Sequence, residues 1–292
     1  MRSSRTEGAI RSGNPAPFSL IMNLSKPTKP QILLTNDDGI RSPGLWAAAG
    51  ALESLGFVTV AAPREQYSGA GRSLPSNSDG IIETLQVKVN GREWIVYAIG
   101  GSPAQTVLHG TLEILPQPPD LVVSGINFGE NIGTGITVSG TVGAALEAAG
   151  IGIPALAVSI ETALEHHYHM SDAVDFTAAA YFTQYFAKIL LEKKMPFDVD
   201  VLNVNIPEDA TLETPWEMTK ISRVRLFEAV VPQRKSWDET GRIGYCYSPN
   251  RDQAEPGTDV YAIRSKKVVS VTPLSLDITS RVDLEELKKL LE

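Results

Sequence analysis

The sequence predicts an α/β fold in which helices cover both faces of a doubly wound, mostly parallel sheet, as in Rossmann-like proteins. Three observations support this prediction. Short apolar runs without polar alternation end in turn residues, as expected of strands buried on both faces. Segments with helix-capping residues follow these runs. Strands and helices alternate from residue 31 to about residue 207, which is typical of doubly wound folds.

The first strand–helix–strand unit has clear local signals. An apolar run ends in the turn sequence Asn-Asp-Asp-Gly. Ser42 and Pro43 are typical of a helix N-cap and of the first helical position, and Gly56 is typical of a helix end. Parallel strands joined in this way form a right-handed crossover. The expected elements are a strand over residues 32–34, a helix over 43–55 and a strand over 57–62.

The middle of the chain continues the alternation. Asn90 and Gly91 form a strong two-residue hairpin signal between two strand-like segments. Ser102 and Pro103 open a helix. We expect strands over 81–89, 93–99, 120–124, 154–159 and 199–203; helices over 103–115, 141–149 and 171–193, the last capped by Ser171; and a glycine-rich loop over 125–140.

The character of the chain changes after about Pro207, where charges and prolines become more frequent. We expect strands over 224–231, 260–263 and 268–271 and a final amphipathic helix over 282–291. The predicted organisation is a disordered extension over 1–29, within which Met22 is an alternative start, a catalytic core over 30–207, and a β-rich oligomerisation arm over 208–292. The arm is too small and polar to fold alone, so we expect it to pack on the core or to exchange between subunits.

Composition limits the possible partners. The net charge is −8 and the pI is near 5.2, so the protein should repel nucleic acid and anionic membranes. No apolar run approaches the roughly 18 residues that span a membrane. A single cysteine, Cys246, excludes an intrachain disulfide. With no signal peptide recognised at the N-terminus, we expect a cytoplasmic protein.

Polar residues follow the first strand at the edge of the sheet where ligands bind in open α/β folds. Asp37 and Asp38 lie there, and Gly39 allows the chain to turn so that both carboxylates face one ligand. Two close carboxylates repel unless a cation lies between them. The alternative interpretation is a solvated surface turn.

Two further loops supply oxygen ligands. Ser68 follows the second strand, and Asn127 follows the strand over 120–124. A hydroxyl and an amide oxygen added to two carboxylates form a hard ligand set that suits Mg²⁺ or Mn²⁺. The alternative is that Ser68 is an ordinary loop serine and Asn127 a turn residue.

The glycine-rich loop leads into a helix N-terminus, where backbone N–H groups bind anions. It has no dinucleotide fingerprint and no P-loop lysine. We expect Asn131, Ser139, Gly140 and Thr141 to bind phosphate, although Ser139 as a simple helix cap is an alternative. Because the predicted metal ligands lie elsewhere, a substitution at Gly140 is expected to leave metal affinity unchanged.

Together these segments resemble the SurE family of stationary-phase survival proteins. In family order they are ILLTNDDGI at 32–40, AAPREQYSGAGRSL at 61–74, VVSGINFGENIG at 122–133, SGTVGAAL at 139–146 and TDVYAIRSKKVVSVTPL at 258–274. One departure is Gln105, which stands where family members often have aspartate.

The resemblance implies a divalent-metal-dependent phosphomonoesterase that hydrolyses nucleoside 5′- and 3′-monophosphates, and sometimes short polyphosphate. It implies one divalent ion per subunit, Mg or Mn, and homodimers or homotetramers that exchange C-terminal segments. The implied metal ligands are Asp37, Asp38, Ser68 and Asn127. The expected catalytic residues are Asp37, Asp38 and Asn131.

Two other functions have some support. A non-catalytic nucleotide-sensing module would keep the glycine-rich loop, but it would not need the complete ligand set. A nicotinamide-dependent oxidoreductase is suggested only by the fold class. His166, His167 and His169 could indicate zinc, although this spacing in a polar loop is more often a solvated run. The resemblance implies another role, in which the pair His167 and Tyr168 lines the substrate entrance. His109 is expected to be a surface or core histidine.

Overall fold

The structure, a computed structural model, describes residues 29–89, 91–164 and 173–292. Its centre is a nine-stranded sheet with the order β3-β4-β2-β1-β5-β6-β7-β11-β8. These strands are β1 (Gln31–Thr35), β2 (Phe57–Pro63), β3 (Ile82–Val89), β4 (Arg92–Ile99), β5 (Leu121–Phe128), β6 (Ala155–Ile160), β7 (Val201–Ile206), β8 (Trp216–Met218) and β11 (Val269–Leu274). The prediction of a mostly parallel sheet is confirmed, because β2, β1, β5, β6 and β7 are parallel neighbours.

The order of the strands creates a topological switch point. From β1 the chain first adds β2 and β4 on one side, and later adds β5, β6 and β7 on the other. The loops after β1 and β5 therefore leave the sheet in opposite directions and open a crevice between them. This crevice is the expected ligand position in an open α/β sheet.

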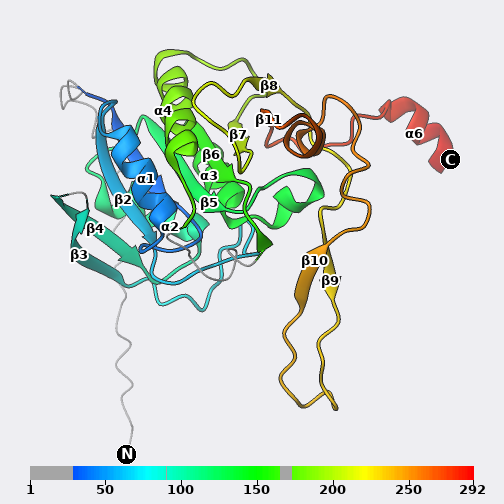
Figure 1. The fold of residues 1–292 in the computed structure, drawn as a ribbon, viewed down its shortest axis with the longest axis horizontal. Helices are drawn as coiled ribbons and strands as arrows, with labels where there is room; N and C mark the ends of the chain where they lie inside the picture. Colours follow the sequence, from blue (N-terminus) through cyan, green and yellow to red (C-terminus); the bar gives the residue numbers. More distant parts are fainter. Residues whose placement is uncertain (1–28, 90, 165–172) are drawn as a thin grey trace, which may run out of the picture.

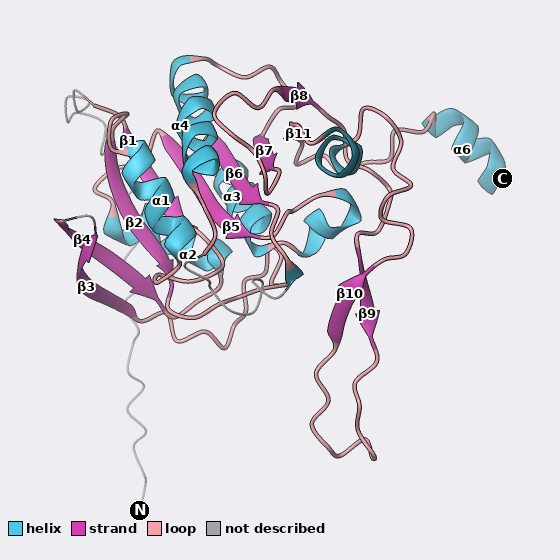
Figure 2. Cartoon of the chain, in the orientation of Figure 1, coloured by secondary structure: helices cyan, strands magenta, loops and turns pink. Residues whose placement is uncertain are grey.

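Helices cover both faces of the sheet (Figure 1 and Figure 2). They are α1 (Pro43–Leu52), α2 (Pro103–His109), α3 (Gly140–Gly150) and α4 (Thr177–Glu192). Helices α1 and α4 pack together over one face, and α2 and α3 over the other. Each pair contributes to its own apolar cluster, so β1 and β5 are buried on both sides, as their continuous apolar runs predicted.

The predicted helix starts at Pro43 and Pro103 are confirmed, with differences at the caps. Ser42 is the N-cap of α1 and Pro43 its first residue, but the Ser42 side chain makes no capping hydrogen bond. Ser102 and Gln105 form a complete capping box at α2. Gln105 also donates to the Pro75 carbonyl oxygen over 2.9 Å. Gln105, the residue that departs from the family pattern, therefore caps α2 and holds the loop at Pro75.

Two predicted elements were wrong. Residues 125–128 were expected in a loop but continue β5, because Asn127 and Phe128 pair with β6 beyond a register shift and the Phe128 ring is buried. Residues 260–263 were expected to be a strand but are helical, in α5 (Asp259–Tyr261) and the turn that follows it (Ala262–Lys266). Thr258 caps this helix by accepting from the Tyr261 N–H group. The strand was predicted from the apolar residues alone, without regard to this cap.

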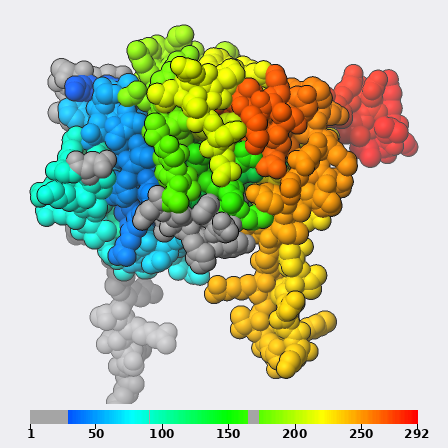
Figure 3. Space-filling model, viewed as in Figure 1, coloured from blue at the N-terminus to red at the C-terminus, as the bar shows by residue number. Residues whose placement is uncertain are grey.

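Part of the chain after residue 207 packs on the core, which is one of the two expected arrangements. Strand β11 pairs antiparallel with β7 and parallel with β8, so two tail strands complete the main sheet. The hairpin of β9 (Phe227–Val230) and β10 (Gly244–Tyr247) extends away from the body (Figure 3). Helix α6 (Leu284–Leu291) ends the chain and has no buried residue.

Some expectations lie outside the described residues: residues 1–28 of the extension expected over 1–29, the turn residue Asn90, the helix cap Ser171 and the histidines His166, His167 and His169. Helix α4 begins at Thr177 rather than at residue 171. Among the residues that are described, none of the helices has the length and apolar character needed to cross a membrane.

Ending the chain after Pro207 should abolish the folded state, because β7 would lose the strand paired along its edge and the buried Val269 and Val271 side chains would be missing. Thermal unfolding monitored by circular dichroism tests whether the shortened chain folds. A control chain ending after Ser280 lacks only the exposed α6 region and should melt cooperatively near the parent temperature. A 1–207 chain with the parent melting temperature would contradict this assignment.

Candidate active site

The turn after β1 brings two acidic residues to the switch point. The Asn36 side chain closes it, donating to the Gly39 carbonyl oxygen over 3.0 Å and accepting from the Gly39 N–H group over 3.1 Å. Gly39 has φ +94°, a conformation that favours glycine. Asp37 and Asp38 are 5% and 3% exposed. The surface-turn alternative is therefore wrong, since these carboxylates are buried.

The start of α3 supports Asp37. The Thr141 hydroxyl donates to Asp37 Oδ1 over 2.5 Å, and the backbone N–H groups of Gly140 and Thr141 also favour its charged form. Burial nevertheless dominates and raises the pKa of Asp37. A positive charge close to this carboxylate would offset that desolvation.

Two other segments contact Asp38. The Phe128 N–H group donates to its Oδ2 over 3.1 Å, and the Gln66 amide donates to its Oδ1 over 3.2 Å. Burial and the neighbouring charge of Asp37 together raise the pKa of Asp38 to about 7. The two carboxylates are thus close enough to disfavour each other's ionisation. A cation bound between them would remove this repulsion, as in a metal site.

Asn127 lies in the extension of β5, and Ser68 lies in the loop after β2. The Asn127 amide nitrogen donates to the carbonyl oxygens of Phe128, over 3.2 Å, and Gly129, over 2.7 Å, which leaves its Oδ1 as the atom for a ligand. Ser68 is exposed. It follows Tyr67, whose N–H group donates to the Asp37 carbonyl oxygen over 2.7 Å, so its loop lies beside the turn after β1.

The donor set fits a hard divalent cation. Two buried carboxylates, one oriented amide oxygen and one exposed hydroxyl provide oxygen ligands without nitrogen or sulfur. Within the described ranges no group of three or more His, Cys, Asp or Glu side chains could hold a metal, so this mixed set is the candidate there.

Asn131 lies in the loop after β5 and is held by side chains of β6 and β7. Its N–H group donates to Asn205 Oδ1 over 2.7 Å, and its carbonyl oxygen accepts from Asn203 over 2.9 Å and from Asn205 over 3.1 Å. Its side-chain amide donates to Ser159 Oγ over 2.9 Å. The sequence analysis did not identify Asn203 and Asn205 as partners of this loop. Their spacing could have indicated such a role, because residues at i and i+2 of a strand point to the same face, and both interrupt an otherwise apolar strand.

The other predicted phosphate ligands serve the helix and Asp37. Ser139 caps α3 by accepting from the Val142 N–H group over 3.1 Å, so the capping alternative describes its contact. A Cβ atom at Gly140 would lie 2.7 Å from the Cβ atom of Asp37. The expectation that Gly140 is independent of the metal ligands therefore conflicts with the geometry.

A buried acidic residue lies next to this loop. Glu130 is 4% exposed, and neither of its carboxylate oxygens has a hydrogen-bond partner among the described residues. Burial, reinforced by the charge of Glu161, raises its pKa to about 8. Glu161 itself is paired with Arg264 over 2.6 Å and with Lys267 over 3.0 Å.

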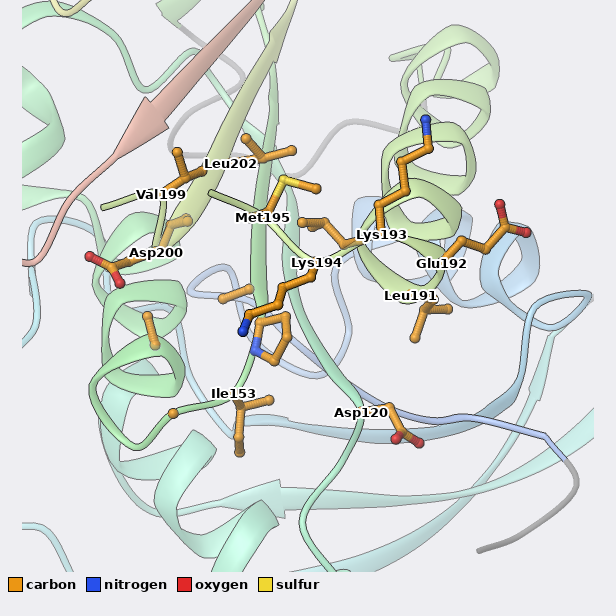
Figure 4. A pocket seen from close by; sticks show the side chains of 16 residues that line it. Asp120, Ile153, Leu191, Glu192, Lys193, Lys194, Met195, Val199, Asp200 and Leu202 are labelled. Atoms are coloured by element: carbon orange, nitrogen blue, oxygen red, sulfur yellow. The ribbon is translucent and has the colours of Figure 1, made fainter. Parts of the chain in front are cut away.

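A cavity of about 460 Å³ lies at the opposite edge of the sheet, near the strand starts at Asp120, Pro154 and Val201 (Figure 4). None of the predicted site residues lines it. His109 pairs with Glu113 over 2.5 Å, as expected for a surface histidine. The chemistry-bearing residues therefore gather at the switch point and not around this cavity.

These features define an α/β protein with a buried, oxygen-rich carboxylate site at the switch point of a parallel sheet. A sequence model of the family described as "Survival protein SurE" matches residues 32–228. The chain belongs to this family, and the resemblance found in the sequence is confirmed.

Relatives cover nearly the whole chain. The protein named 5′-nucleotidase SurE of Methanosarcina acetivorans is 42% identical over 276 residues, which is 92% of this chain and 100% of the relative. Its counterpart in Thermococcus gammatolerans is 44% identical over 262 residues, 89% and 96% of the two chains. The crystal structure of the SurE protein from Aquifex aeolicus superimposes with a TM-score of 0.67 at 34% identity, covering 90% of this chain and 100% of that one.

Glu130→Gln should flatten the pH dependence of stability in metal-free protein. The unfolded chain releases the Glu130 proton near pH 4.5 and the folded protein near pH 8, so this residue lowers stability as pH rises between those values. The slope is at most roughly 1.4 kcal/mol per pH unit. Urea unfolding from pH 5 to 8 measures it. Glu93→Gln, at an exposed glutamate, should retain the parent slope, and an unchanged slope in Glu130→Gln would refute the assignment.

Gly140→Ala should weaken Mn²⁺ binding by about tenfold or more, because the new methyl group would displace Asp37 from its position. Calorimetric titration measures the dissociation constant. Gly135→Ala is the matched control, since a Cβ atom there meets nothing within 4 Å. Equal affinity in both variants would show that Mn²⁺ binding does not depend on the position of Asp37.

Proposed function

We propose that the chain is a divalent-metal-dependent phosphomonoesterase that hydrolyses nucleoside 5′- and 3′-monophosphates to nucleoside and phosphate, with short polyphosphate as a further substrate. The observation that carries the proposal is the buried pair Asp37 and Asp38 at the switch point. The name 5′-nucleotidase borne by relatives of similar length supports the substrate class.

In this proposal Asp37, Asp38, Asn127 and Ser68 hold one Mg²⁺ or Mn²⁺ ion. When bound, such an ion polarises the phosphate and lowers the pKa of a coordinated water. Other residues of the chain position the two carboxylates. Thr141 donates to Asp37, while Gln66 and the Phe128 N–H group donate to Asp38.

The phosphate then needs donors from uncharged groups, because residues 125–152 contain no lysine or arginine. Asn131 is the proposed contact, since its backbone is fixed and its side chain lies beside Ser159. Ser139, Gly140 and Thr141 contribute through the positive end of α3, although Thr141 also binds Asp37.

The proposal includes a cytoplasmic homodimer or homotetramer that binds neither nucleic acid nor membrane. Large apolar side chains on the β9–β10 hairpin and on α6 are exposed, which supports association between copies. They are Val231 at 83%, Trp237 at 93%, Ile243 at 73% and Leu290 at 82% exposure.

A non-catalytic nucleotide sensor is the alternative. It would bind nucleoside monophosphates without releasing phosphate, and it would not require both carboxylates. The buried pair of Asp37 and Asp38 at the switch point favours the enzyme.

Asp37→Asn and Asp38→Asn should each lower phosphate release from p-nitrophenyl phosphate and from nucleoside monophosphates by at least about 100-fold, because the ion contributes several kcal/mol. Both variants should remain folded, since each removes a repelling buried charge. Asp209→Asn, at an exposed aspartate, is the control. EDTA should abolish the parent activity and Mg²⁺ or Mn²⁺ restore it; a parent that binds nucleotide without turnover would support the sensor.

A further inference from the structure

The loop that carries Asn131 is held from two sides. On one side lies β7, whose Asn203 and Asn205 side chains bind the backbone of Asn131. On the other side lies the C-terminal tail, which the loop meets at Gly133 and Thr134. The position of Asn131 thus depends on a body strand and on a segment more than a hundred residues further along the chain.

Asp259 makes the tail contact. Its carboxylate is fully buried and accepts from the N–H groups of Gly133, Ser222 and Val260, each over 2.8 Å. Hydrogen bonds to a charged acceptor are stronger than neutral ones. The carboxylate therefore joins the loop with Asn131, the loop segment at Ser222 and its own helix at a single point.

The same tail segment is anchored elsewhere. Arg264 and Lys267 pair with Glu161, whose side chain is 4% exposed just beyond β6. Nearby, Lys266 pairs with Glu217 on the surface. Because these contacts do not involve Asp259, its substitution should leave the tail docked while releasing Gly133.

We propose that Asp259 is a positioning residue for Asn131. By holding the Gly133 N–H group two residues away, it sets the direction in which the Asn131 amide meets the phosphate. This role rests on the phosphomonoesterase function proposed above. If Asp259 has this role, phosphate binding by Asn131 requires the tail to be docked on the core. The tail itself contributes no metal ligand.

A double-mutant cycle tests the proposal. The full-length parent, Asp259→Asn, Asn131→Ala and the double variant are compared by kcat and KM for a nucleoside monophosphate and by calorimetric Mn²⁺ affinity. An amide at residue 259 cannot accept from all the N–H groups, so the loop is released with little change in volume. Glu217→Gln, which breaks the surface pair with Lys266, is the control and should match the parent.

We expect Asp259→Asn to lower kcat/KM by about tenfold or more in the parent background and by less than about twofold in the Asn131→Ala background. Mn²⁺ affinity should stay within about twofold of the parent in both backgrounds, as Asp259 contacts no proposed ligand. Such non-additivity is specific to positioning, because general destabilisation would lower activity equally in both backgrounds.

Equal losses in the two backgrounds, or a parallel loss of Mn²⁺ affinity, would overturn the role of Asp259 while leaving the proposed function intact. A parent without phosphatase activity would instead overturn the proposed function. If Asp259→Asn does not fold, Asp259→Glu provides the same cycle, because it keeps the charge but shifts the acceptor away from Gly133.

Discussion

The structure depends on two carboxylates buried side by side where the winding of the sheet reverses direction. Burial and mutual repulsion both oppose their ionisation, and the pKa values of Asp37 and Asp38 are raised accordingly. The surroundings supply donors from several elements: Thr141 from α3, the Phe128 N–H group from β5 and Gln66 from the loop after β2. These donors offset the cost of burial only in part, so the arrangement is suited to a divalent cation.

The same constraint explains how the neighbouring segments are built. Strand β5 runs past the point where a loop was expected, and this extension carries the Phe128 N–H group to Asp38 and the Asn127 amide to the same edge. Helix α3 begins with Gly140 packed on Asp37. Beyond β5, the loop with Asn131 is tied to β7 and to the tail, so the loop that we propose to orient phosphate is held by parts of the chain far from the carboxylates.

Local signals predicted much of this from sequence. The apolar run before Asn-Asp-Asp-Gly located the carboxylates, and proline and serine located the helix starts. Contacts between residues far apart in the sequence could not be predicted in this way. A serine-glycine-threonine helix start indicates an anion site, but only the fold shows that the Asp37 side chain lies there and accepts from Thr141. Nothing local reveals that Asn203 and Asn205 bind Asn131, and the apolar residues 260–263 matched a strand until their capping by Thr258 was visible.

Anomalous diffraction at the manganese edge, from crystals of the parent protein grown with Mn²⁺, tests whether the carboxylate pair holds a divalent ion. We predict one strong peak per chain between Asp37 and Asp38, with oxygen ligands at about 2.0–2.3 Å that include the Asn127 amide. A map with no peak at the carboxylate pair, or with its peak at another group of residues, would contradict it.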